Sequence, residues 1–192
     1  MKAQFKATIL ILLLSLLLFT IPAFAKDLEN KIGAGFASSL SYGFLGSADD
    51  NLTNSIIATN DLSIKYWFTN YVGIQGQFGY FTAKNGPVGG WAADIAVRGL
   101  FNIILEEQMN LYAGLGLGIL PAHVDYGQHG VSDMNEVGFQ ASGFGGVEFF
   151  FSGLPNLGFN LEIGLKYIDI DKFKALSTYG GPFATVGFHY YF

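Results

Sequence analysis

The chain has 192 residues, the length of one domain of ordinary size, and its 10 basic and 15 acidic residues give a net charge of −5. This acidic balance excludes a protein that holds nucleic acid on a basic face, and the absence of cysteine excludes a fold held by disulfides. The histidines and carboxylates recur at no metal-ligand interval, so we predict no bound metal and no cofactor.

The first 25 residues have the pattern of a secretory signal. Lys2 and Lys6 precede an apolar run over 7–19, and Ala-Phe-Ala at 23–25 gives the small-x-small sequence of a cleavage site. The run is short for a membrane-spanning helix, and an uncleaved anchor is the alternative. Cleavage would remove two lysines and leave 26–192, which is 192 less 25 or 167 residues, as one domain with a net charge of −7.

Eight strand-like stretches follow along the mature chain, each alternating between large apolar and small or polar residues. Their expected limits are 31–44, 61–68, 71–82, 91–102, 110–120, 137–151, 157–168 and 183–192. The breaks alternate in length: 69–70, 103–109 and 152–156 are short, and 45–60, 83–90, 121–136 and 169–182 are long. Short turns at one end and long loops at the other are typical of outer-membrane barrels. An even number of strands places both termini at the short-turn, periplasmic end.

Charged residues inside these strands all fall on one face. The set is Lys65, Asp94, Arg98, Glu148, Glu162 and Lys166. The opposite face is uncharged and bulky, and a charge that faces lipid at mid-membrane costs about 2–4 kcal/mol. We therefore expect the charged face to line the inside of a barrel, where three basic and three acidic groups form a lumen ion-pair network. A polar path or gate is the functional alternative for the same six residues.

The predicted fold is all-β: an eight-stranded antiparallel up-and-down transmembrane β-barrel with a side-chain-filled lumen. Glycines on the charged face would make room for large inward side chains such as Trp67, Tyr112 and Phe144. Aromatic residues at both ends of the apolar face would form girdles at the two headgroup levels. A soluble, lipocalin-like barrel is the rival fold, but it would expose the whole apolar face to water.

Three stretches carry a resemblance to a known group of proteins. They are NLYAGLGLGI at 110–119, NLEIGLKYIDID at 160–171 and YYF at 190–192. Together with the predicted barrel, they resemble the small outer-membrane β-barrels of Gram-negative bacteria, of the OmpA, OmpX and OmpW type, with OmpW nearest locally. The resemblance implies an integral protein of the bacterial outer membrane, in contact with its lipid and lipopolysaccharide.

The last predicted strand alternates up to the final residue. Phe188, Tyr190 and Phe192 share its apolar face. This terminal pattern is similar to the assembly signal that the barrel-assembly machinery reads in the same group of proteins. The resemblance therefore implies that machinery as a partner of the C-terminal strand.

Two non-enzymatic functions remain open. The first is a structural, adhesive or envelope-protective role, carried by the extracellular loops. The second is an OmpW-like channel or binding protein for small hydrophobic molecules. Its lumen would be lined by Trp67, Tyr112, Phe144 and Phe150.

A lipid-modifying enzyme is the third reading, and we expect no enzyme and no catalytic residues. His129, Ser132 and Glu136 lie in one predicted loop, and a catalytic triad needs a fixed geometry that a loop seldom supplies. The His-x-x-Ser spacing also differs from the His-x-Ser pair on a strand that lipid A deacylases of this barrel class present. His189 is expected to face the lumen as a structural residue.

Overall fold

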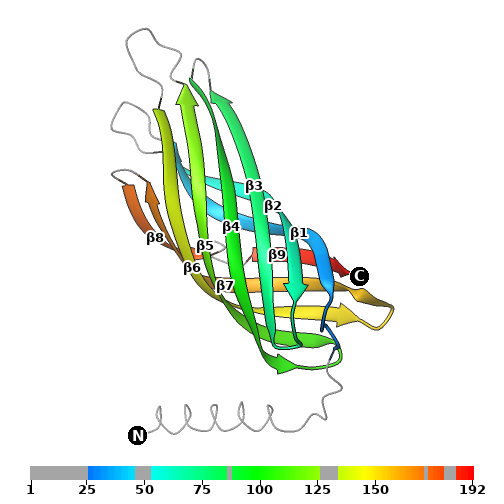
Figure 1. Cartoon of the computed structure of the whole chain (residues 1–192). Coiled ribbons are helices and arrows are strands. Elements are labelled where there is room, and N and C mark those ends of the chain that lie inside the picture. The colour runs from blue at the N-terminus through cyan, green and yellow to red at the C-terminus, as the bar shows by residue number, and fades with distance from the viewer. Residues whose placement is uncertain (1–25, 46–52, 86–87, 126–133, 171–172, 180–184) are drawn as a thin grey trace, which may run out of the picture.

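The computed structural model describes residues 26–45, 53–85, 88–125, 134–170, 173–179 and 185–192. These residues form one antiparallel sheet that closes on itself (Figure 1). Its strands are β1 Ile32–Leu45, β2 Thr53–Trp67, β3 Val72–Asn85, β4 Val88–Leu105, β5 Met109–Asp125, β6 Met134–Phe151, β7 Leu154–Ile170, β8 Phe173–Tyr179 and β9 Thr185–Tyr191. In this part of the chain no helix is long and apolar enough to cross a membrane.

The nine described strands occupy eight positions around the barrel. Each strand from β1 to β7 pairs antiparallel with the next, and β9 pairs with both β7 and β1 to close the ring. β8 pairs with 164–170 of β7, whereas β9 pairs with 157–162 of the same strand. The two short strands therefore act as successive pieces of one barrel strand, and the predicted eight-stranded antiparallel barrel is confirmed.

The strands run further into the long breaks than the sequence predicts. β2 begins at Thr53, inside the expected loop 45–60, and β8 lies wholly within the expected loop 169–182. At the other end β7 begins at Leu154, inside the expected turn 152–156. The predicted strand ends were wrong because they were placed where the apolar alternation of side chains stops. Lipid imposes that alternation only on the part of a strand that faces it. Backbone pairing needs no such pattern and continues past the residues that show it.

The wall is not uniformly paired along its height. Figure 1 shows β3 to β6 as long neighbouring strands that form one side of the molecule. The β1–β2 ladder extends along all of β1, but the β2–β3 ladder covers only 62–67 against 73–78. The barrel is therefore closed at the level of the lumen side chains and splits between β2 and β3 towards the long-loop end.

Large apolar side chains face outward and polar ones face inward, as predicted. Along β9 every second residue is buried, and β7 alternates in the same way over most of its length. Leu115 and Ile163 are 69% and 63% exposed, whereas Lys65 and Glu148 are fully buried. An exposed apolar surface of this extent is stable only when lipid covers it.

Replacing Leu115 by arginine is expected to lower the free energy of unfolding from phospholipid vesicles by about 2–4 kcal/mol, because the charge would face lipid at mid-depth. Ile103→Arg is the matched control. Ile103 is 62% exposed but lies past Phe101, beside a short turn, so the same charge should cost only about 0–1 kcal/mol there. Equal losses at the two positions, measured by reversible urea unfolding, would contradict the lipid-facing assignment.

Inward glycines make room for large side chains, which confirms the expectation for Trp67, Tyr112 and Phe144. A Cβ atom on Gly73 would lie 2.7 Å from a ring carbon of Trp67. One on Gly146 would lie 2.7 Å from the Tyr112 ring, and one on Gly114 would clash with the ring of Phe144. A narrow lumen can hold three such rings only where the facing positions lack side chains.

Candidate functional site

The six charged residues predicted to line the lumen are all buried and form three ion pairs. Lys65 Nζ lies 3.2 Å from Glu148 Oε1, and Arg98 Nη2 lies 2.6 Å from Glu162 Oε2. The third pair joins Lys166 Nζ to Asp94 Oδ2 at 3.4 Å. Each pair links strands that are distant in sequence but face each other across the barrel, so these contacts brace the lumen from within. The role of the network remains a prediction.

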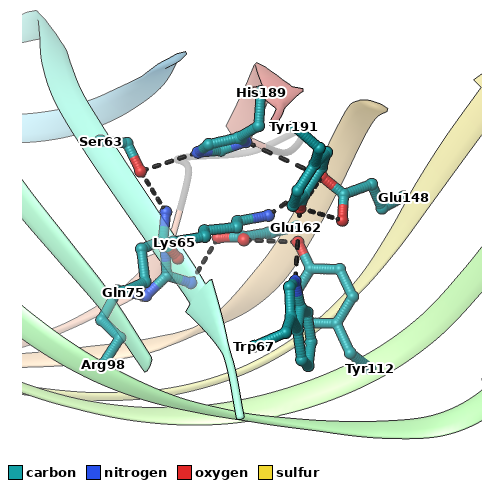
Figure 2. A network of polar contacts seen from close by, with 10 residues as sticks. All are labelled: Ser63, Lys65, Trp67, Gln75, Arg98, Tyr112, Glu148, Glu162, His189 and Tyr191. Atoms are coloured by element: carbon teal, nitrogen blue, oxygen red, sulfur yellow. Dashed lines mark hydrogen bonds and ion pairs between the residues drawn. The ribbon is translucent and has the colours of Figure 1, made fainter. Parts of the chain in front are cut away.

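Two tyrosines complete the partners of the buried carboxylates (Figure 2). Tyr112 donates its hydroxyl to Glu162 Oε1 at 2.6 Å. Tyr191 donates to the carboxylate of Glu148, from which its hydroxyl lies 2.9 and 3.0 Å. Trp67 in turn donates its indole N–H to the hydroxyl oxygen of Tyr191 over 3.5 Å. Carboxylates held by both a cation and a hydroxyl are well compensated for burial.

Aromatic faces support the two inner cations. The guanidinium carbon of Arg98 lies 3.6 Å from the ring centre of Phe144. Lys65 Nζ lies 5.2 Å from the ring centre of Tyr112. Cation–π contacts of this kind gain strength in a site without water. Phe144 and Tyr112, predicted as an apolar wall, therefore also stabilise the charge network.

Ser63, His189 and Glu148 form an arrangement that sequence reasoning missed. Ser63 Oγ lies 2.8 Å from His189 Nε2, and His189 Nδ1 lies 3.8 Å from Glu148 Oε1 (Figure 2). The order of groups is that of a serine hydrolase, but Gln75 Nε2 also donates to Ser63 Oγ at 2.5 Å. All four side chains are buried, and the Ser63 hydroxyl is held between His189 and Gln75. In the sequence, each of these residues falls on the inward face of its predicted strand. That shared face was the only sequence signal that could have grouped them.

The predicted apolar lumen residues lie together at the short-turn end. Trp67, Tyr112, Phe144 and Phe150 pack in one buried cluster with Leu28, Leu100 and Tyr191. Leu28 is fully buried although it precedes the first strand. The four predicted lining residues thus form a packed floor, and a residue from outside the barrel wall completes it.

The segment 26–31 precedes the first strand and lies across the short-turn mouth. Leu28 N donates to Asn70 Oδ1 at 2.6 Å in the β2–β3 turn. Lys26 N donates to Glu106 O at 3.0 Å in the β4–β5 turn, and Lys26 Nζ to Pro155 O at 2.5 Å at the start of β7. We call this segment the strap, because it ties all three short turns together and carries Leu28 into the floor.

The Lys26 side chain anchors the first residue of the strap. Its ammonium lies 5.1 Å from the ring centre of Phe150, which is itself buried in the floor. Partial burial lowers the pKa of Lys26 from its ordinary value, and the nearby charge of Lys31 lowers this pKa further. The ring face and the Pro155 carbonyl oxygen offset this cost of desolvation.

The outer half of the lumen is more polar. Gln140 donates its side-chain amide to Asp94, and a small recess lies beside this pair. The recess is lined by Gln77, Asp94, Ala96, Arg98, Gly116, Leu117, Gln140, Ser142 and Lys166. Asp61, also buried, adds a fourth lumen carboxylate that the sequence analysis left out because it was taken as the first residue of its strand.

Residues assigned to loops lie partly on strands. Glu136 is on β6, while His129 and Ser132 lie outside the described residues, so the candidate triad in that loop has no described geometry. Asp169, the last residue but one of β7, forms a 3.1 Å ion pair with Lys174 of β8. The hydrogen bond from Lys174 lowers the pKa of Asp169 and raises the pKa of Lys174. In the described ranges no three His, Asp or Glu side chains gather as a metal site.

The C-terminal aromatic residues face outward. Phe188, Tyr190 and Phe192 are exposed on β9 and its end, and Phe192 N donates to Ile32 O at 2.9 Å. The terminal strand is thus fastened to the first strand, with its apolar face towards lipid. Recognition of this face by the assembly machinery remains a prediction.

No protein-family model matches the chain, and no curated protein matches it in sequence. Solved structures match it in fold. The N-terminal β-barrel domain of Pseudomonas aeruginosa OprF superposes with a TM-score of 0.55 at 13% identity, over 85% of this chain and 98% of that one. Neisserial surface protein A gives 0.54 at 17% identity, over 84% and 96%. Ail, the attachment invasion locus protein of Yersinia pestis, gives 0.50 at 22% identity, over 85% and 99%. The chain therefore has the fold of small outer-membrane β-barrels.

Proposed function

We propose that this protein is an integral, non-enzymatic barrel of the bacterial outer membrane, with both termini in the periplasm and a lumen that does not conduct. Its role is structural, adhesive or envelope-protective, and its contacts are made by the strand ends and connections beyond the membrane. The observation that carries the proposal is the filling of the barrel at successive levels.

Three layers of side chains support a closed lumen. Leu28 and the aromatic floor occupy the short-turn end, and the strap covers them. Above the floor, the Arg98–Glu162 and Lys65–Glu148 pairs cross the barrel. Their side chains are at most 1% exposed. The Lys166–Asp94 pair lies beside the outer recess. Eight strands enclose little space beyond such side chains.

Passage of small hydrophobic molecules is the second candidate. The apolar floor supplies the wall that such a ligand would need, but its rings are packed against one another and against Leu28. Opening a path would require the strap to leave and the ion pairs to separate. A buried charge that loses its partner is strongly unfavourable, so the buried pairs favour the closed state.

Single-channel recording tests the two candidates against each other. The refolded mature chain, shown to be folded by its heat-dependent gel shift, is added to a planar bilayer with and without small hydrophobic solutes. We expect no discrete conductance steps from the native chain. Steps that these solutes block would overturn the proposal in favour of the channel.

Leu28→Gly is a useful companion variant for the same recording. It removes the floor residue contributed by the strap but leaves the three ion pairs in place, so we expect this variant to be silent as well. Conductance in Leu28→Gly alone would place the only seal at the strap and would contradict the role given to the ion pairs.

A further inference from the structure

The ring of strands closes where β1 meets β9, and we call this junction the seam. β1 and β9 are the first and last strands of the sheet in chain order, so hydrogen bonds join them and a turn does not. Their ladder covers 33–38 against 186–191, and Phe192 N adds one hydrogen bond to Ile32 O at 2.9 Å. Among the described residues β8, which continues β9, pairs with β7 and not with β1. The seam is therefore paired along its short-turn half.

The other side of β9 is also held by a short ladder. β9 pairs with β7 over 185–190 against 157–162. The ladder between β4 and β5, by comparison, extends over 89–105 against 110–125. A strand with few backbone hydrogen bonds separates from its neighbours at a lower free energy than one with many. Of the strands that close the ring, β9 therefore needs further support at the seam.

Contacts between neighbouring turns fasten the rest of the short-turn end. Asn102 of β4 donates its backbone N–H to Tyr71 O at 2.9 Å and its side-chain amide to Asn70 O at 2.7 Å. These bonds join β4 to the β2–β3 turn. Phe150 N of β6 donates to Gln108 O of the β4–β5 turn at 2.7 Å. A corresponding link between the β6–β7 turn and β1 has to pass the end of β9.

The strap supplies that link. It leads directly into β1, and its first residue reaches the start of β7, where Lys26 Nζ donates to Pro155 O at 2.5 Å. Its other end is fixed to β2, because Asn30 N donates to Trp67 O at 2.8 Å and Trp67 N donates to Lys31 O at 3.1 Å. The left-handed backbone of Asn30, with φ of 59°, turns the chain between the two attachments. The strap thus spans from β1 to β7.

We propose that the strap is a latch on the seam: it keeps β9 held between β1 and β7, and its release lets β9 separate from the ring. Widening of the gap between β1 and β7 would break the hydrogen bond from Lys26 and pull Leu28 out of the floor. The latch acts on the wall of the barrel and not on its lumen. The inference therefore goes beyond the proposed function and does not depend on it.

Hydrogen exchange of the refolded chain 26–192 in phosphatidylcholine vesicles tests the latch strand by strand. Lys26→Ala removes the tie to Pro155, so we expect the backbone amides of 185–191 to exchange about fivefold faster while those of β5 stay unchanged. Lys26→Arg keeps a cationic donor and should exchange like the native chain. Lys31→Ala is the matched control, because it removes an exposed lysine side chain from the same strap, and no change is expected.

A disulfide across the seam gives an independent readout, because the chain has no cysteine of its own. Phe36 and Phe188 are paired across the seam, with ring centres 5.6 Å apart. Ile95 and Ile119 are paired across β4 and β5 and are exposed to a similar degree. The oxidised double variant Phe36→Cys with Phe188→Cys should abolish the effect of Lys26→Ala. The oxidised pair Ile95→Cys with Ile119→Cys should leave that effect in place.

Faster exchange in every strand of Lys26→Ala would show that this lysine adds only general stability, and the latch would be overturned. Native exchange rates in β9 of Lys26→Ala would overturn it too. So would an effect of Lys26→Ala that persists when the seam is cross-linked. The comparison of β9 with β5 decides the question even where a cysteine pair does not oxidise.

Discussion

Replacing Glu162 by alanine is expected to lower the free energy of unfolding by about 3–5 kcal/mol, because the substitution removes the carboxylate that balances the buried charge of Arg98. Arg98 is 1% exposed, and its guanidinium lies 2.6 Å from Glu162. The same substitution removes the acceptor of the Tyr112 hydroxyl. Urea unfolding from phospholipid vesicles, followed by far-ultraviolet circular dichroism, measures the loss.

A double variant separates the charge effect from the packing effect. In Arg98→Met with Glu162→Met no charge is left alone, so most of the stability should return. Lys174→Ala breaks the exposed pair with Asp169 and should have little effect. If the double variant were as unstable as Glu162→Ala, packing rather than charge compensation would explain the loss.

Replacing Trp67 by alanine is expected to destabilise the barrel by about 3–5 kcal/mol, since a large ring would leave a cavity in the floor. Trp67 is fully buried against Leu28 and Tyr191, and Gly73 leaves no side chain that could fill the space. Circular dichroism is again the probe, because the substitution removes one of the two tryptophans and would itself change the fluorescence. The cavity should also free Leu28, so protease should cut the strap sooner.

Trp91→Ala is the matched control for the floor tryptophan. It removes the same side chain from the outside of the barrel, where Trp91 is 40% exposed, and no cavity forms in the protein. The expected loss is less than that of Trp67→Ala. Equal losses at the two sites would show that the floor is not tightly packed.

The alternation of side chains predicted the inward face of the barrel, and the structure pairs all six of its predicted charges. The pairs themselves could not be predicted, because alternation gives the face of a residue and not the partner across the lumen. Lys65 meets Glu148 over 83 positions in the chain, and Arg98 meets Glu162 over 64. Only the closure of the sheet brings these residues together.

The strap and the outer end of β5 were not predicted for two different reasons. Leu28 lies outside any periodic stretch, so no pattern marks it as a floor residue, although it is fully buried. His123 was assigned to a loop, because its neighbours lack the apolar alternation that lipid imposes, and β5 nevertheless continues past it to Asp125. Both errors arose at residues that lie outside the apolar alternation from which the strands were predicted.

The sequence by itself determined the class of fold. Each of the eight strands has a bulky uncharged face and a face of small and charged residues. Only a closed barrel turns every bulky face towards lipid and also leaves no strand edge without a hydrogen-bonded partner. The tertiary structure alone decided what fills that barrel and what seals it. Contacts across the lumen depend on the strand register. Contacts across its mouth depend on the path of the strap, which has no periodic pattern. Both are settled only when the sheet closes.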